Sequence, residues 1–130
     1  MQRRFYLFLL VTILYSCTAL SQGSSAGNPV MYADVPDMSM IRVGDTYYMS
    51  STTMHMAPGV PIMKSKDLVN WELVNYVFPD GAPDWALNNF WAPELSYDEK
   101  QGKVYLYYTA RDKRTKRLSC AAAVAGSPLG

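Results

Sequence analysis

Turn-forming residues interrupt this chain of 130 residues so often that no long segment is left between them. After Asn28, apolar runs of strand length alternate with pairs such as Gly-Asp, Pro-Gly, Asp-Gly and Gln-Gly. No window in this region has the apolar period of a helix, whereas short runs rich in tyrosine and branched residues are typical of strands. The sequence therefore predicts an all-β fold. The strands we expect span residues 38–43, 46–53, 60–65, 71–74, 94–97, 104–109 and 118–124.

A repeat within the chain indicates how these strands are grouped. Pro36-Asp37 is matched by Pro93-Glu94 further along, and Gly44 is matched by Gly102, with a tyrosine-rich strand after each glycine. Units of four short strands that recur at about 50 residues are typical of β-propeller blades. Strands without polar alternation fit this arrangement, because neighbouring blades cover both faces of a blade. A β-sandwich with a coincidental repeat is the alternative fold.

The propeller interpretation assigns residues 22–130 to the first blade and most of the second. The second unit has no room for a fourth strand before Gly130, and two blades cannot close a ring. Open blade faces and unpaired strand edges make poor stand-alone structures. We therefore expect the chain to be the front part of a longer protein or a truncated gene product.

Residues 1–21 have the pattern of an export signal. Two arginines precede an apolar run from Phe5 to Tyr15 that is too short for a membrane span, and Ala19-Leu20-Ser21 offers a cleavage site. The segment ending at Cys17 also resembles a bacterial lipobox, in which this cysteine is acylated. Either outcome predicts an exported protein that is periplasmic, extracellular or held at the outer membrane. A lipid on Cys17 is the one membrane contact that we expect.

Charge and the remaining motifs argue against several classes of partner. The formal net charge is +1, so no global field attracts nucleic acid. The basic run at 111–117 is expected to be a solvated hairpin tip. The sequence has no glycine-rich phosphate loop, nucleophile elbow or metal-binding pair, and no protein partner is evident. Cys120 is expected to be a small buried residue rather than half of a disulfide.

Asp37 is the strongest candidate for a catalytic residue. It follows Pro36 at the start of the first expected strand, where rigid backbone holds a carboxylate at a sheet edge within reach of a substrate. In a propeller, this position is expected to face the central funnel. From the local sequence alone, a catalytic base and a carboxylate that caps a turn are equally supported. Asp34 is the second candidate.

Four segments between residues 28 and 110 combine turn residues with aromatic strands, and they occur in this order: Asn28–Val30 with Pro36–Ser39, Arg42–Met49, Pro58–Trp71, and Phe90–Leu95 with Tyr105–Tyr108. Together they resemble glycoside hydrolase family 43, whose members are five-bladed propeller enzymes acting on arabinose- and xylose-containing plant polysaccharides. One segment alone is a weak match, but four in sequence are specific.

The resemblance implies roles for the carboxylates. In the family, the acid that follows proline in the first segment is the general base, and here this residue is Asp37. In inverting hydrolysis the base removes a proton from water, while an acid roughly 6.5 to 9.5 Å away protonates the leaving oxygen. The family's acid and a second, orienting aspartate belong to later blades. The implied reaction is that of an α-L-arabinofuranosidase or β-xylosidase, and a chain ending at Gly130 is expected to be inactive alone.

Four more residues are expected to contact the substrate, a pentose-containing oligo- or polysaccharide. Trp91 and Phe90 offer flat apolar faces to a sugar, with core packing as the alternative. His55 follows the second strand, in a loop where the family often places substrate contacts; an exposed histidine without a role is the alternative. Glu94 would touch substrate or support a blade. No cofactor is required, and a structural calcium ion is left open only for a full-length protein.

Two rival accounts stay open. One is a carbohydrate-binding propeller without hydrolytic activity, and the other is a truncated gene product without a function of its own. A Glu-Gly-Pro-like motif encoded after residue 130 would favour the enzyme, whereas its absence from a complete ring would favour the binding protein.

Overall fold

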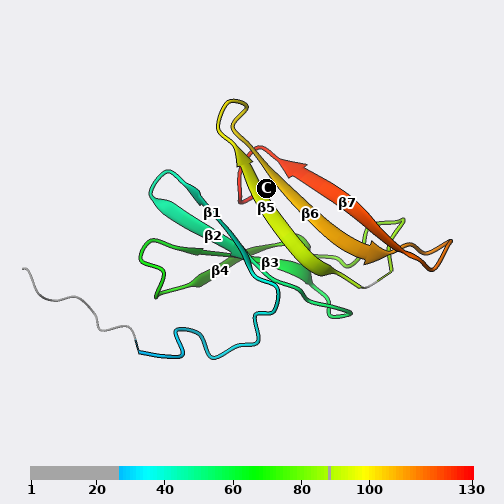
Figure 1. Cartoon of the computed structure of the whole chain (residues 1–130), viewed down its shortest axis with the longest axis horizontal. Coiled ribbons are helices and arrows are strands. Elements are labelled where there is room, and N and C mark those ends of the chain that lie inside the picture. Colours follow the sequence, from blue (N-terminus) through cyan, green and yellow to red (C-terminus); the bar gives the residue numbers. More distant parts are fainter. Residues whose placement is uncertain (1–26, 88) are drawn as a thin grey trace, which may run out of the picture.

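The computed structural model describes residues 27–87 and 89–130, which form two antiparallel sheets (Figure 1). The predicted export signal, with Cys17, lies outside the described residues. Within the described part, no helix is long and apolar enough to cross a membrane. The first sheet contains β1 (Ser39–Val43), β2 (Thr46–Ser50), β3 (Gly59–Ser65) and β4 (Glu72–Phe78), and the second contains β5 (Trp91–Asp98), β6 (Lys103–Arg111) and β7 (Leu118–Ala125).

Each strand pairs with its neighbour in sequence, so both sheets are up-and-down meanders. Val43 and Thr46 are cross-strand partners, which makes the connection between β1 and β2 a tight turn, and Gly44 adopts φ 62° in it. Gly102 adopts φ 63° just before β6. Glycine reaches this left-handed region without a steric penalty. The two glycines of the sequence repeat therefore occupy equivalent turns of the two sheets.

The observed strands confirm the predicted all-β fold, and the largest differences in their bounds are in β2, β4 and β5: β2 ends at Ser50 and not at residue 53. β4 continues to Phe78, beyond its expected end at residue 74, and β5 begins at Trp91 instead of Glu94. The register between β5 and β6 shifts between Trp91 and Glu94. This bulge accommodates Pro93, which has no N–H to give to a regular ladder. The predicted strand begins only after Pro93, because the sequence carries no signal for the bulge.

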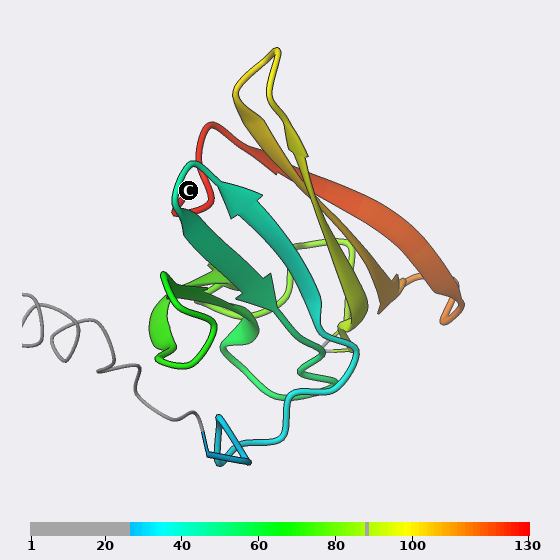
Figure 2. The ribbon, with the colours of Figure 1, turned by 60° about the vertical axis from the view of Figure 1, so that its left-hand side comes forward.

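An aromatic cluster joins the two sheets. Phe90 is only 1% exposed, and its ring stacks on Phe78 with 4.5 Å between centroids. Tyr108 of β6 meets both rings edge-on, and Trp85 lies 6.2 Å from it. Large rings in such arrangements contribute much of the energy of a core. Figure 2 shows the two sheets as two layers. The other buried members of the core between them are Val60, Ile62, Ala86, Leu95, Val104, Leu106 and Ala110.

The opposite face of the second sheet is open to solvent. Tyr107, Leu118 and Val124 are each about half exposed on it, and the rings of Tyr105 and Tyr107 stack 6.4 Å apart. Cys120 is also exposed there, so the expectation of a buried cysteine was wrong. The reason is the alternation of β7, which turns every second side chain away from the core.

The turn between β3 and β4 shows what the end of the segment Pro58–Trp71 does in the structure. The carboxylate of Asp67 accepts hydrogen bonds from the backbone N–H groups of Asn70 and Val69 and from the Asn70 side chain. These donors, the Asn70 N–H first, hold the pKa of Asp67 well below its usual range. The Trp71 indole donates to the carbonyl of Leu68 at 3.2 Å. This segment therefore builds a turn.

Gly59 lets the first sheet approach the Phe90 ring, and a methyl group there is expected to destabilise the fold. The Cβ of an alanine would lie 2.9 Å from two carbons of that buried ring. We expect Gly59→Ala to lower the free energy of unfolding by about 1–3 kcal/mol. The control is Gly126→Ala, where the new carbon meets no atom within 4 Å. Urea unfolding measures both, and an equal effect of the two substitutions would contradict this account of the core.

Candidate active site

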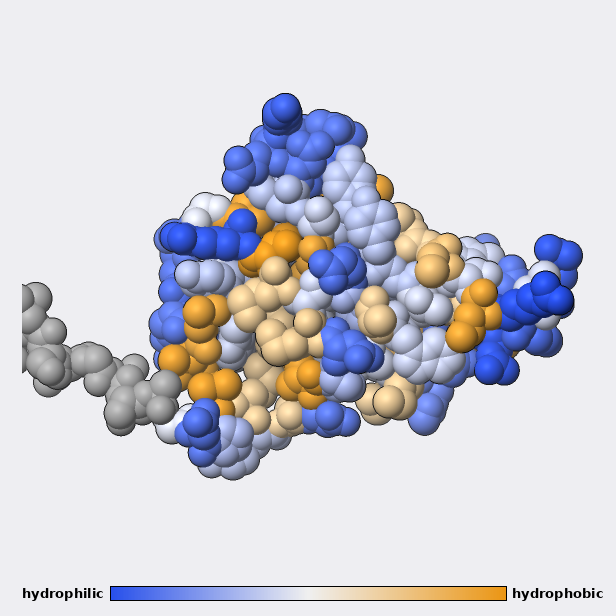
Figure 3. Space-filling view, in the orientation of Figure 1, coloured by the Kyte–Doolittle hydropathy of each residue, from blue (hydrophilic) through white to orange (hydrophobic). Residues whose placement is uncertain are grey.

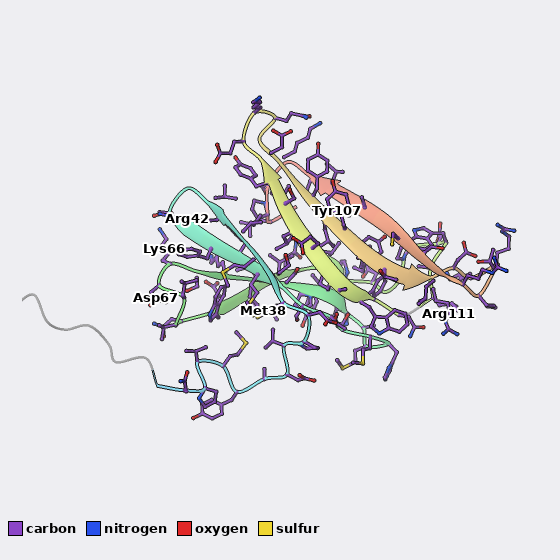
Figure 4. All side chains as sticks on the ribbon, viewed as in Figure 1. Met38, Arg42, Lys66, Asp67, Tyr107 and Arg111 are labelled. Carbon is purple, nitrogen blue, oxygen red and sulfur yellow. The ribbon has the colours of Figure 1, made fainter. Side chains whose placement is uncertain are left out.

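Asp37 lies two residues before β1, at the end of the sheets where β1 and β5 begin and β2 ends. Its side chain is exposed, so water and a substrate can reach the carboxylate. Met38, its neighbour, marks this end of the first sheet in Figure 4. The structure thus places the predicted base at a sheet entrance, as the sequence indicated.

Thr52 holds this carboxylate in place. Its hydroxyl donates a hydrogen bond to Oδ2 of Asp37 at 2.7 Å, and its backbone N–H donates to the carbonyl of Pro36 at 3.0 Å. The same hydroxyl oxygen accepts the backbone N–H of Ala92 at 2.8 Å. Because Thr52 is 4% exposed, its side chain has little freedom to turn away. Two donors from one buried residue therefore fix the position of the acid.

Three further contacts close the seam between the sheets at this end. Met54 and Phe90 exchange both backbone hydrogen bonds, at 3.0 and 2.8 Å. The hydroxyl of Ser39 accepts the N–H of Leu95 at 2.9 Å. The site is consequently built on the junction of two sheets and not on a free loop. Rigid support of this kind is what a catalytic group needs in order to keep its geometry.

The backbone at the seam is strained. Asp37, Met54, Val60 and Ala92 adopt φ values of 49°, 52°, 56° and 47°, a region that residues other than glycine seldom occupy. The strain is most severe for Val60, which is β-branched. Each such residue costs roughly 1–3 kcal/mol, and such conformations cluster at functional sites where the surrounding structure holds them. Two of these residues, Asp37 and Ala92, are hydrogen-bonded to the same Thr52 side chain, which supports a site at this point of the seam.

Glu94 and Trp91 lie near the seam on β5. Glu94 is exposed, and Trp91 is partly exposed and pairs with Thr109 of β6. Trp91 precedes Ala92, whose backbone N–H donates a hydrogen bond to Thr52. Trp91 therefore lies at the same end of the sheets as Asp37. Both side chains keep the accessibility that a substrate contact requires, and their predicted roles remain predictions.

Phe90 and His55 differ from this group in their burial or in the element that carries them. Phe90 is buried in the aromatic cluster, which leaves no face of its ring for a sugar, and its position is that of the packing alternative. His55 is exposed in the loop between β2 and β3. Asp34, the second candidate for the base, is exposed in the segment before β1. Among the residues described, no three His, Cys, Asp or Glu side chains are arranged to hold a metal ion.

Two meander sheets in sequence order, packed face to face and with an acid at the entrance of the first strand, have the arrangement of successive blades of a β-propeller. The sequence model of the family described as Glycosyl hydrolases family 43 matches residues 26–130. The chain therefore belongs to glycoside hydrolase family 43. The fold is accordingly part of a five-bladed propeller, of which this chain holds the first blade and most of the second.

Relatives with recorded activities match the same region. A β-xylosidase of Formosa agariphila is 45% identical over 75 residues, which is 58% of this chain and 11% of that protein. A non-reducing end α-L-arabinofuranosidase of Bacteroides ovatus is 32% identical over 109 residues, which is 79% of this chain and 20% of that protein. The chain therefore spans a small part of the length of these enzymes.

Solved structures show the same arrangement of strands. The family 43 protein BlXynB from Bacillus licheniformis superposes with a TM-score of 0.67 at 31% identity, over 79% of this chain and 22% of that one. Sequence and structure thus agree on the family, and both matches involve about a fifth of a larger enzyme or less.

Thr52 is the site residue that sequence reasoning missed. It belongs to the run Ser50–Thr53, four small hydroxyl residues that are all buried. Such a run at the end of a strand is a usable signal, because buried hydroxyl groups need partners and a nearby carboxylate is one. What the sequence did not reveal is that the partner backbone comes from the second sheet.

Removal of the Thr52 hydroxyl is expected to weaken the seam. Thr52→Val keeps the shape of the side chain but leaves the Ala92 N–H and the Asp37 carboxylate without this partner. We expect a loss of about 1–3 kcal/mol in the free energy of unfolding. The matched control is Thr46→Val, because Thr46 donates to Asp45 at an exposed position. Thermal or urea unfolding compares them, and a Thr52→Val protein as stable as the control would disprove the role of this hydroxyl.

Proposed function

We propose that this chain supplies the general base of an inverting glycosidase that releases xylose or arabinose from plant polysaccharides or oligosaccharides. Asp37 is the base in this proposal. It takes a proton from a water molecule as that water attacks the anomeric carbon of the sugar. Membership of family 43 supports the reaction class, and the relatives named above include both a β-xylosidase and an α-L-arabinofuranosidase.

The single observation that carries the proposal is the hydrogen bond from Thr52 to Asp37. A base in this reaction has to keep its carboxylate in a fixed position toward the attacking water, and a donor that points at one carboxylate oxygen holds the group there. The hydroxyl of Thr52 accepts the Ala92 N–H, which leaves its own hydrogen to point toward Asp37. One oxygen of the carboxylate is held in this way, while the side chain remains open to water. Both conditions suit proton abstraction from an attacking water molecule.

The general acid lies outside this chain in our proposal. Inverting hydrolysis needs a second carboxyl group across the bond that breaks, and removal of either partner lowers the rate by about 100- to 10,000-fold. Glu94 is not assigned this role, because its Trp-Ala-Pro-Glu setting belongs to a different segment of the family pattern. Trp91 and Glu94 are proposed to line the sugar site beside the base. Export of the protein through residues 1–21, with or without a lipid on Cys17, is part of the same proposal.

Asp37→Asn tests the assignment of the base, and Asp34→Asn is its matched control. Both residues are exposed aspartates that lie three positions apart. In the complete translated product of the gene, we expect Asp37→Asn to lower turnover of 4-nitrophenyl β-D-xyloside or α-L-arabinofuranoside by about 100-fold or more. Asp34→Asn is expected to keep turnover within about twofold, a change of roughly 0.4 kcal/mol in the barrier.

A larger loss with Asp34→Asn than with Asp37→Asn would move the base to Asp34. Turnover by the 130-residue chain alone would contradict the placement of the acid outside it. Azide added to the Asp37→Asn protein is a further check, because this anion can attack the anomeric carbon in place of water and needs no base. Circular dichroism of each variant separates a lost reaction from a lost fold.

A further inference from the structure

The hairpin tip between β6 and β7 holds the densest group of cations in the chain. Residues 111–117 contain five lysines and arginines and one aspartate, and all five cations are exposed. The whole chain has a formal net charge of only +1, so the remaining residues are net negative. The hairpin is therefore a local positive site on a molecule that is otherwise slightly acidic.

The one carboxylate of the tip is committed to its own loop. Asp112 accepts the backbone N–H groups of Thr115 at 2.7 Å and Arg114 at 2.8 Å, and these bonds hold the pKa of Asp112 below its usual range. Both ion pairs found among the described residues belong to the first sheet and its turns, Lys64 with Glu72 and Lys66 with Asp45. The five cations of the tip thus have no ion-pair partner within the described part of the chain.

The tip extends from the same end of the sheets as Asp37. β6 ends at Arg111, while β5, its antiparallel partner, begins at Trp91 next to the residue that bonds Thr52. Figure 4 labels Arg111 at the base of this hairpin, well to the right of Met38, and Figure 3 shows a strongly hydrophilic projection where the hairpin leaves the body. The backbone N–H of Lys113 donates to the carbonyl of Trp85 at 2.9 Å, which fastens the base of the projection to the core.

We propose that this hairpin binds the carboxylate groups of acidic sugar residues carried by the same polysaccharide, and so selects chains with uronic acid branches. This inference rests on the proposed function, which brings a glycan to this end of the sheets. Guanidinium and ammonium groups form their strongest hydrogen bonds with carboxylates, and exposed cations on a fixed loop can meet such branches at several spacings. A neutral pentose chain offers them no charge.

A polysaccharide is favoured over a lipid surface or nucleic acid by the charge of the rest of the chain. A membrane or a nucleic-acid duplex presents an extended negative surface, which would also face the net negative remainder of the chain and be repelled by it. A single uronic acid branch of a polysaccharide would meet only the hairpin tip. The two acids in this region, Asp84 and Asp112, are too few to cancel the five cations.

The test compares two pairs of substitutions that each remove two exposed cations from a hairpin. Lys113→Gln with Arg114→Gln alters the proposed site, and Lys100→Gln with Lys103→Gln alters the turn between β5 and β6 at the opposite end. Affinity electrophoresis of the full chain measures binding to glucuronoxylan and to the same polymer after its carboxyl groups have been reduced to alcohols. Vesicles with anionic phosphatidylglycerol and a DNA duplex are the other two probes.

We expect the unaltered chain to bind glucuronoxylan roughly fivefold or more tightly than the reduced polymer, an advantage that salt weakens. The first pair of substitutions should remove this advantage, and the second pair should preserve it. Equal binding of the two polymers, equal weakening by both pairs, or tighter binding to vesicles or duplex would each overturn the inference. This experiment measures binding and not turnover. A failure to bind acidic polysaccharide would therefore overturn only this inference. Retained turnover by the Asp37→Asn protein would overturn the proposed function instead.

Discussion

The placement of Phe90 between the two sheets is the constraint on which the remaining structure depends. Its ring stacks on Phe78 and contacts Tyr108, and its backbone pairs with Met54. Hydrophobic burial and hydrogen bonding therefore act on the same residue, one holding the layers together and the other fixing their relative position. The absence of a side chain at Gly59 allows the close contact. From this junction the chain continues directly into Ala92, and so into the hydrogen bonds that orient Asp37.

The seam shows how a small all-β unit can hold an exposed acid rigidly. Strand ends are usually the most mobile part of a sheet, yet here Thr52 and Ala92 tie two of them together beneath the carboxylate. The unusual φ values of Asp37, Met54 and Ala92 raise the energy of this region, and the aromatic cluster beside it offsets that cost. A stable core next to a strained site is the arrangement expected where function and stability make different demands.

Much of the fold was accessible from the sequence, because turn residues and strand patterns are local signals. Gly44 and Gly102 marked equivalent turns, and Asp37 stood where a strand begins. Features that depend on distant contacts were not accessible. The bulge at Pro93 and the burial of Phe90 arise from the second sheet closing on the first. Phe90 and Trp91 are adjacent in sequence, and only the pairing with Met54 decides which ring enters the core.

The hydrogen bonds of the seam join residues that are far apart in sequence, which has a consequence for the folding of this protein during translation. The bond between Thr52 and Ala92 joins residues 40 positions apart, and the bond from Thr52 to Asp37 spans another 15. Translation delivers the amino-terminal strands first, and contacts between distant residues carry the largest loop-closure entropy. A nascent chain that has released only β1 to β4 already displays its acid but lacks the backbone group that completes its support. Orientation of the carboxylate is therefore a late event in maturation, coupled to the docking of the next blade.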